Sequence, residues 1–157
     1  MSLANYPLFV FSVLFAFVAS ISLFPTSFNV WRPEWMGLVI FYWVFRAPEH
    51  FGVTTAWVLG VLLDALEGQV LGVNALGLVM VAALVQITHH RLRVFAMPQL
   101  AMMVFLVLGL NQMVVHFVRG FLGGGAPGFE YLYPAMTGAL IWPIWCVVLD
   151  RLSFPTR

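Results

Sequence analysis

The sequence predicts an all-α integral membrane protein, folded as a compact bundle of about six transmembrane helices with short loops. Of its 157 residues, 62% are hydrophobic and 8% are charged, whereas soluble domains are roughly 45–50% apolar and 25% charged. A soluble domain of this length buries only about 70% of its unfolded surface, so large apolar patches would face water. No long repeat or low-complexity tract divides the chain, and we expect a single domain over residues 1–157.

Four apolar runs approach the roughly 20 residues that a helix needs to cross a bilayer. They are Tyr6–Phe24, Val70–Thr88, Ala96–Val118 and Phe129–Leu149. The first run is longer than the core of a signal peptide and no basic residue precedes it, so we expect it to be a retained span.

Two shorter apolar runs, Trp35–Phe45 and Phe51–Leu63, lie between the first and second long runs. At 1.5 Å per residue neither crosses about 30 Å of hydrocarbon unless its flanks join the helix or the bilayer thins. Pro33 suits a first helical turn, and Ala65 and Leu66 could lengthen the second helix. The alternative is a re-entrant hairpin surrounded by protein. Both alternatives give an even number of crossings, so the two termini share a side.

The arginines are distributed unevenly between the two ends of the expected spans. Arg32 and Arg119 fall on one side, and five fall on the other: Arg46, Arg91, Arg93, Arg151 and Arg157. Positive charge is enriched in cytoplasmic loops, so the bias predicts that both termini are cytoplasmic.

The densest basic cluster consists of His89, His90, Arg91 and Arg93. Attraction to anionic lipid explains a cluster at this place without any specific partner. The net charge is only +1, and no basic face suited to nucleic acid is evident. We therefore expect anionic lipid at the cytoplasmic arginines and no nucleic acid.

Asp64 directly follows the short apolar run Phe51–Leu63. A carboxylate within a span is energetically costly unless it lies near a helix end. It could be a proton or cation ligand, but capping a neighbouring helix or pairing with an arginine is the favoured interpretation. Small residues also recur at every fourth position around it, at Ala56, Gly60, Gly68 and Gly72. On one continuous helix they would form a stripe for close packing, whereas Gly68 and Gly72 equally suit a chain reversal.

On the helix expected from the apolar run Ala96–Val118, Gln112, His116 and Arg119 share one face, and Asn111 adjoins it. Such a face is expected to point into protein. Amide and imidazole side chains more often join membrane helices than carry a substrate, so packing is favoured over a transport or proton-relay role.

Signatures of enzymatic or metal chemistry are missing from the sequence. The single cysteine, Cys146, excludes an intramolecular disulfide and a multi-cysteine metal site. There is no phosphate-binding glycine loop, no Gly-x-Ser-x-Gly elbow and no His-Glu-x-x-His pattern. We expect no cofactor, no metal site and no enzymatic activity.

One series of residues, in its order and spacing, resembles the MreD family of rod shape-determining proteins. The series is Trp31-Arg-Pro-Glu-Trp35, Phe41-Tyr-Trp43, Pro48, Gly52, Trp57, Gly60-Val-Leu-Leu-Asp64, Gly68 and Leu71-Gly72. The resemblance extends over the whole chain, since length, short loops and Trp142-Pro143 in the last run also fit.

The resemblance implies a non-enzymatic scaffold or regulatory subunit of the rod-shape (elongation) complex in the bacterial inner membrane. It implies an MreC-like bitopic partner, association with MreB, RodA and a penicillin-binding transpeptidase, and a part in controlling peptidoglycan synthesis and cell shape. It also implies a fold similar to the S-components of energy-coupling-factor vitamin transporters.

Two sets of site residues follow. Candidates for partner binding or helix packing are Trp31, Arg32, Pro33, Trp35, Gly60, Asp64, Gly68 and Gly72. The two tryptophans are expected to be interfacial anchors, with a docking edge as the alternative. A small-molecule-binding or transport subunit is the alternative function, and it would place a polar pocket near Asp64 or near the buried face of Asn111, Gln112 and His116.

Overall fold

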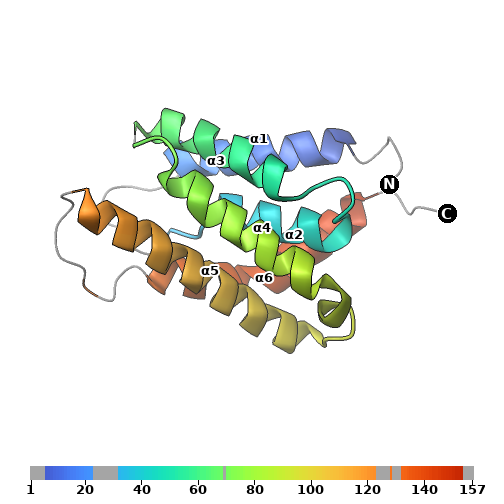
Figure 1. Ribbon diagram of the computed structural model, residues 1–157. Helices are drawn as coiled ribbons and strands as arrows, with labels where there is room; N and C mark the ends of the chain where they lie inside the picture. The colour runs from blue at the N-terminus through green and yellow to red at the C-terminus, as the bar shows by residue number, and fades with distance from the viewer. Residues whose placement is uncertain (1–5, 23–31, 69, 123–127, 129–131, 154–157) are drawn as a thin grey trace.

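The computed structural model describes residues 6–22, 32–68, 70–122, 128 and 132–153, and these residues contain six helices and no strand. The helices are α1 (Tyr6–Ser22), α2 (Trp35–Arg46), α3 (Val53–Glu67), α4 (Val73–Leu92), α5 (Met97–Phe121) and α6 (Tyr133–Leu152). Figure 1 shows them running roughly along one direction, with the α3–α4 turn at one end and the α4–α5 turn at the other. The prediction of an all-α bundle is confirmed.

Three helices, α4, α5 and α6, are long and apolar enough to cross a membrane by length and composition. Their lengths are 20, 25 and 20 residues. The first expected span corresponds to α1, which has 17 described residues and is apolar but shorter. Phe24 and Phe129, at the borders of two expected spans, lie outside the described residues.

The borders of the two short runs differ from the expectation in one respect. Ala65 and Leu66 do belong to α3, which ends at Glu67. Pro33 does not join the first turn of α2, because this helix begins at Trp35 and Glu34 stands before it. The prediction for Pro33 was therefore wrong, and α2 has only 12 residues.

The short helix α2 forms the centre of the bundle. Each of its residues from Met36 to Val44 is buried, and it packs against α1, α4, α5 and α6. Its aromatic side chains contact rings from neighbouring elements, as in the edge-to-face pairs of Phe41 with Trp142 and of Trp43 with Phe9. An apolar helix buried on all sides is typical of a core element.

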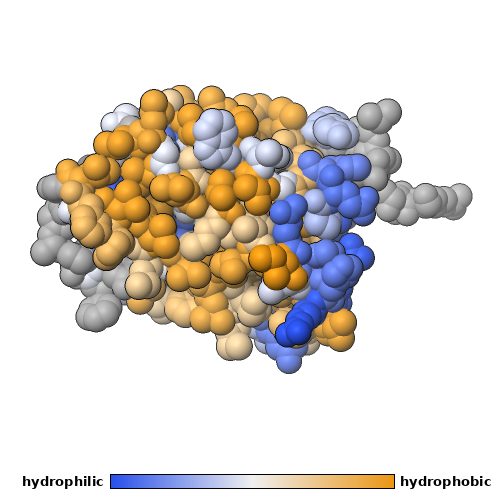
Figure 2. Space-filling model, viewed as in Figure 1, coloured by the Kyte–Doolittle hydropathy of each residue, from blue (hydrophilic) through white to orange (hydrophobic). Residues whose placement is uncertain are grey.

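We call one end of the bundle the basic end, because four arginines lie there: Arg46, Arg91, Arg93 and Arg151. Ion pairing of Arg46 with Asp150 places the end of α2 beside the end of α6, and Gln86 of α4 donates to the Pro48 carbonyl of the α2–α3 turn. Figure 2 shows hydrophilic side chains gathered at this end and hydrophobic ones over the body. Arg32 and Arg119 lie toward the opposite end, as the sequence predicted.

Helices α3 and α4 approach each other closely at Gly60. A Cβ atom on Gly60 would lie 2.3 Å from Cα and 2.8 Å from N of Ala75. Both neighbours are backbone atoms, which cannot turn aside as a flexible side chain can. The absence of a side chain at Gly60 is what permits this contact.

Replacing Gly60 by alanine should therefore force α3 and α4 apart. We expect Gly60→Ala to lower the unfolding temperature in detergent, at a cost of about 1–3 kcal/mol for overpacking. The matched control is Gly120→Ala on α5, where a Cβ meets nothing within 4 Å and alanine improves helix propensity by up to about 1 kcal/mol. Equal unfolding temperatures for the two variants would contradict the packing described for α3 and α4.

Candidate functional site

Asp64, near the end of α3, caps the beginning of α4. Its Oδ2 accepts hydrogen bonds from the backbone N–H groups of Gly72 at 2.8 Å and Ala75 at 3.4 Å, and its Oδ1 accepts from Asn74 at 3.0 Å. The first N–H groups of a helix have no partner within the helix, and a carboxylate there also complements the helix dipole. These contacts agree with the interpretation of Asp64 as the cap of a neighbouring helix.

The small residues around Asp64 do not form one helical stripe, because the chain reverses between α3 and α4. Gly68 follows the end of α3 with φ of +64°, and Gly72 precedes α4 with φ of +103°. Glycine adopts this left-handed conformation without the steric cost that other residues pay. The chain-reversal interpretation of Gly68 and Gly72 therefore describes the structure, whereas Gly60 lies in the helix contact.

Glu34, which was not among the predicted site residues, joins the polar face of α5 to α2. Asn111 Nδ2 donates to Oε1 of Glu34, and Gln112 Nε2 donates to Oε2 at 2.9 Å. Glu34 immediately precedes α2, so both of its oxygens fix the beginning of the central helix against α5. The only signal in the sequence was an acid directly before an apolar run, and its partners are 77 and 78 positions away.

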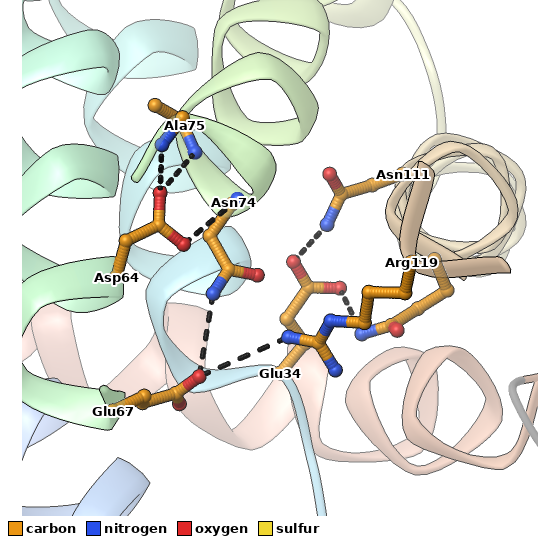
Figure 3. Close-up of polar contacts among 9 residues, drawn as sticks. Glu34, Asp64, Glu67, Asn74, Ala75, Asn111 and Arg119 are labelled. Atoms are coloured by element: carbon orange, nitrogen blue, oxygen red, sulfur yellow. Dashed lines mark hydrogen bonds and ion pairs between the residues drawn. The ribbon is translucent and has the colours of Figure 1, made fainter. Parts of the chain in front are cut away.

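A cavity of about 600 Å³ opens above this contact, toward the opposite end of the bundle, and all six helices contribute to its lining. Its polar lining residues are Ser20, Arg32, Glu34, Glu67, Asn74, Gln112 and Arg119. Figure 3 shows Glu34, Glu67 and Arg119 converging from separate segments. Glu67 accepts from Asn74 Nδ2 at 3.3 Å and lies 4.0 Å from the Arg119 guanidinium.

The remaining candidates of the predicted polar face occupy different surroundings. Asn111 is buried behind Glu34, and its Oδ1 points toward Gly77 of α4. Gln112 lines the cavity, whereas His116, one turn further along α5, and Asp64 do not belong to its lining. The structure thus brings Gln112 and Arg119 to one cavity and uses Asn111 and Asp64 to join helices.

The described part of the tryptophan-flanked segment, from Arg32 to Trp35, packs against neighbouring helices. Trp35 is half-buried and packs against Phe15 of α1 at 5.5 Å and Trp145 of α6 at 5.8 Å between ring centroids. Pro33 is buried, and Arg32 lines the cavity. Trp31 lies outside the described residues. Trp35 therefore joins three helices.

The basic end carries a second polar contact to α2 and the predicted basic cluster. Asp150 of α6 pairs with Arg46 and accepts a hydrogen bond from Tyr42 Oη at 2.7 Å. The rings of His89 and His90 lie 3.8 Å apart. His90, Arg91 and Arg93 are exposed there, which leaves their charges available to a membrane surface.

The arrangement can do two things chemically. Its buried carboxylates and amides position helices, and its cavity presents carboxylates and guanidinium groups to a ligand of matching charge. Within residues 6–22, 32–68, 70–122, 128 and 132–153, no three His, Cys, Asp or Glu side chains come together as a metal site.

Substitution of Asp64 by asparagine tests the cap. An asparagine amide would turn an N–H donor toward N–H groups, so Asp64→Asn should cost about 1–3 kcal/mol and lower the unfolding temperature by several degrees. The control is Glu49→Gln, which removes one negative charge at an exposed position of the α2–α3 turn. If Asp64→Asn unfolds at the same temperature as Glu49→Gln, the cap does not stabilise the fold.

Comparisons with known proteins identify the family of this chain. The family model for rod shape-determining protein MreD matches residues 2–150. Rod shape-determining protein MreD of Haemophilus influenzae (strain ATCC 51907 / DSM 11121 / KW20 / Rd) is 26% identical over 136 residues, which cover 87% of this chain and 83% of that protein. No solved structure gives a significant match, so the similarity to transporter S-components stays a prediction. With the family model matched over nearly its whole length, the chain belongs to the MreD family of rod shape-determining proteins.

Proposed function

We propose that this chain is a non-enzymatic scaffold or regulatory subunit of the rod-shape complex in a bacterial inner membrane. In this role it binds an MreC-like bitopic protein and helps to control peptidoglycan synthesis and cell shape. MreB, RodA and a penicillin-binding transpeptidase would be further members of the assembly. The observation that carries the proposal is the match to the MreD family of rod shape-determining proteins over residues 2–150.

The distribution of apolar side chains supports a partner that approaches within the membrane. Large hydrophobic side chains are exposed along the outer helices, such as Phe11 on α1, Trp57 on α3 and Phe117 on α5. A bilayer can cover these side chains, and so can the spanning helix of a bitopic protein. Because most described residues belong to helices, helix faces provide most of the surface for such a partner.

The orientation that we propose has both termini in the cytoplasm. Arg46, Arg91, Arg93 and Arg151 lie at the basic end, which would face the cytoplasm and its anionic lipid, in keeping with the positive-inside rule. The cavity would then open toward the outer face of the membrane. Enzymatic activity forms no part of the proposal.

Purification of the tagged chain from its native membrane in a mild detergent tests the proposed assembly. We expect mass spectrometry to identify an MreC-like bitopic protein at a comparable molar amount, because a scaffold acts through stable contacts. A lysate containing a tagged, unrelated inner-membrane protein of similar size is the control for detergent-induced association. Recovery with a nucleotide-binding transporter module instead, or without any stoichiometric protein, would contradict the scaffold function.

The alternative function, a small-molecule-binding or transport subunit, is supported by one observation, the 600 Å³ cavity. Against it, Asp64 and Asn111 are committed to contacts between protein elements. A scaffold that carries a ligand site accounts for both sets of contacts.

A further inference from the structure

We propose that the cavity at the opposite end binds a phosphate group, held by Arg32 and Arg119. The phosphate would belong either to the head group of an anionic lipid or to a free phosphate compound. This inference takes from the proposed function only the location of the protein in a bilayer. It requires no protein partner.

The carboxylates of the cavity already have donors within the protein. Both carboxylate oxygens of Glu34 accept hydrogen bonds, from Asn111 and Gln112. Glu67 Oε2 accepts from Asn74 at 3.3 Å and faces Arg119. A cationic ligand would have to compete with these internal donors for the three oxygens.

The donor groups of the cavity are in excess. Arg119 reaches Glu67 only at 4.0 Å, and its Nε is buried without an acceptor among the described residues. Arg32 also lines the cavity and forms no ion pair or hydrogen bond with another part of the chain that the structure describes. Each guanidinium carries five N–H donors in a planar fork that matches the oxygens of phosphate. Two such groups around one cavity favour a ligand with several anionic oxygens.

The charged side chains that line the cavity cancel formally, so a phosphate would be held by direct contacts with the arginines. Arg32 and Arg119 formally balance Glu34 and Glu67, so no strong net field attracts an anion. The long Glu67–Arg119 contact is, however, weak in comparison with a charge-assisted hydrogen bond of about 2.7–2.9 Å. A phosphate can therefore replace Glu67 as the partner of Arg119.

The size and position of the cavity suit such a ligand. Its volume of about 600 Å³ falls in the range of roughly 300–1,000 Å³ that is usual for ligand sites. Apolar side chains, among them Ile21, Leu66 and Val115, line it beside the polar groups. The planar forks of two guanidinium groups match the oxygens of a lipid phosphate, and the apolar walls would receive the adjoining part of the lipid.

Thermal unfolding of the purified full chain in a neutral detergent tests the inference. The probes are inorganic phosphate at constant ionic strength and dihexanoylphosphatidylglycerol, with hexyl glucoside as the uncharged amphiphile. We expect a saturable rise in the unfolding temperature with phosphatidylglycerol, because a ligand that binds only the folded state stabilises it. A similar rise with inorganic phosphate would identify the phosphate group alone as sufficient, and a rise with phosphatidylglycerol only would identify the lipid as the source.

Three variants locate the binding. Arg32→Gln removes a guanidinium that has no internal partner among the described residues, and it should weaken the apparent affinity at least about tenfold without lowering the basal unfolding temperature. Arg119→Gln should weaken affinity similarly. Arg93→Gln, at the basic end, is the matched control for the general attraction of anionic lipid to exposed arginines, and it should leave the saturable binding at the cavity intact. The absence of any saturable rise with either probe, or equal affinity of Arg32→Gln and Arg93→Gln, would overturn the inference. Partner proteins are absent from this experiment, so its failure would leave the co-purification result unaffected.

Discussion

The hydrogen bonds from Asn111 and Gln112 to Glu34 are the contact on which the architecture depends. Helix α2 has 12 residues, or about 18 Å at 1.5 Å per residue, whereas the hydrocarbon core of a bilayer is about 30 Å thick. In the membrane that we propose, a polar residue at the beginning of so short a helix needs partners within the protein. Two amides of the longest described helix, α5, supply them.

The depth of this contact explains why a cavity exists. Gln112 lies nine residues before Phe121, the last residue of α5, so α2 begins about 14 Å short of that end of α5. Helices α3 and α5 extend beyond the beginning of α2, with Glu67 and Arg119 near their ends, and the space above Glu34 becomes the cavity. At the basic end, Tyr42 and Arg46 both contact Asp150 of α6. The central helix is thus fixed at both ends to long neighbours, which gives a scaffold a defined shape.

The lengths and positions of the apolar runs were sufficient to predict about six helices, because each described helix coincides with one apolar run of the sequence. Polar residues and glycines at the borders were harder to interpret. Asp64 was correctly interpreted as a cap because its partners lie within 11 positions, a spacing that a turn between two helices allows. Pro33 was placed in the first helical turn because a proline before an apolar run suits that position. In the structure α2 begins only at Trp35, and Glu34 accepts hydrogen bonds from α5.

Contacts between distant segments could not be predicted from one sequence. Glu34 and its amide partners are separated by 77 and 78 positions, and no local pattern connects them. The same holds for Trp35, whose ring contacts lie in α1 and α6, far from it in the sequence. Arg32 was predicted as a candidate for partner binding or packing and Arg119 as part of a polar helix face, but the cavity that they share results from the packing of six helices.

The most direct test of this account is an exchange of the two side chains that join α2 to α5. Gln112→Glu, made alone, places two carboxyl groups against each other and removes the donor between them. Glu34→Gln, made alone, is a milder change, because the Gln112 amide can rotate so that its oxygen accepts from the new amide, while Asn111 donates to the new carbonyl oxygen. The double variant restores one amide donor opposite one carboxylate. We predict that Gln112→Glu lowers the unfolding temperature in detergent by several degrees, for a cost of about 1–3 kcal/mol, and that the double variant recovers most of the loss. If Gln112→Glu unfolds at the temperature of the unmodified chain, the contact does not hold the central helix and the account is wrong.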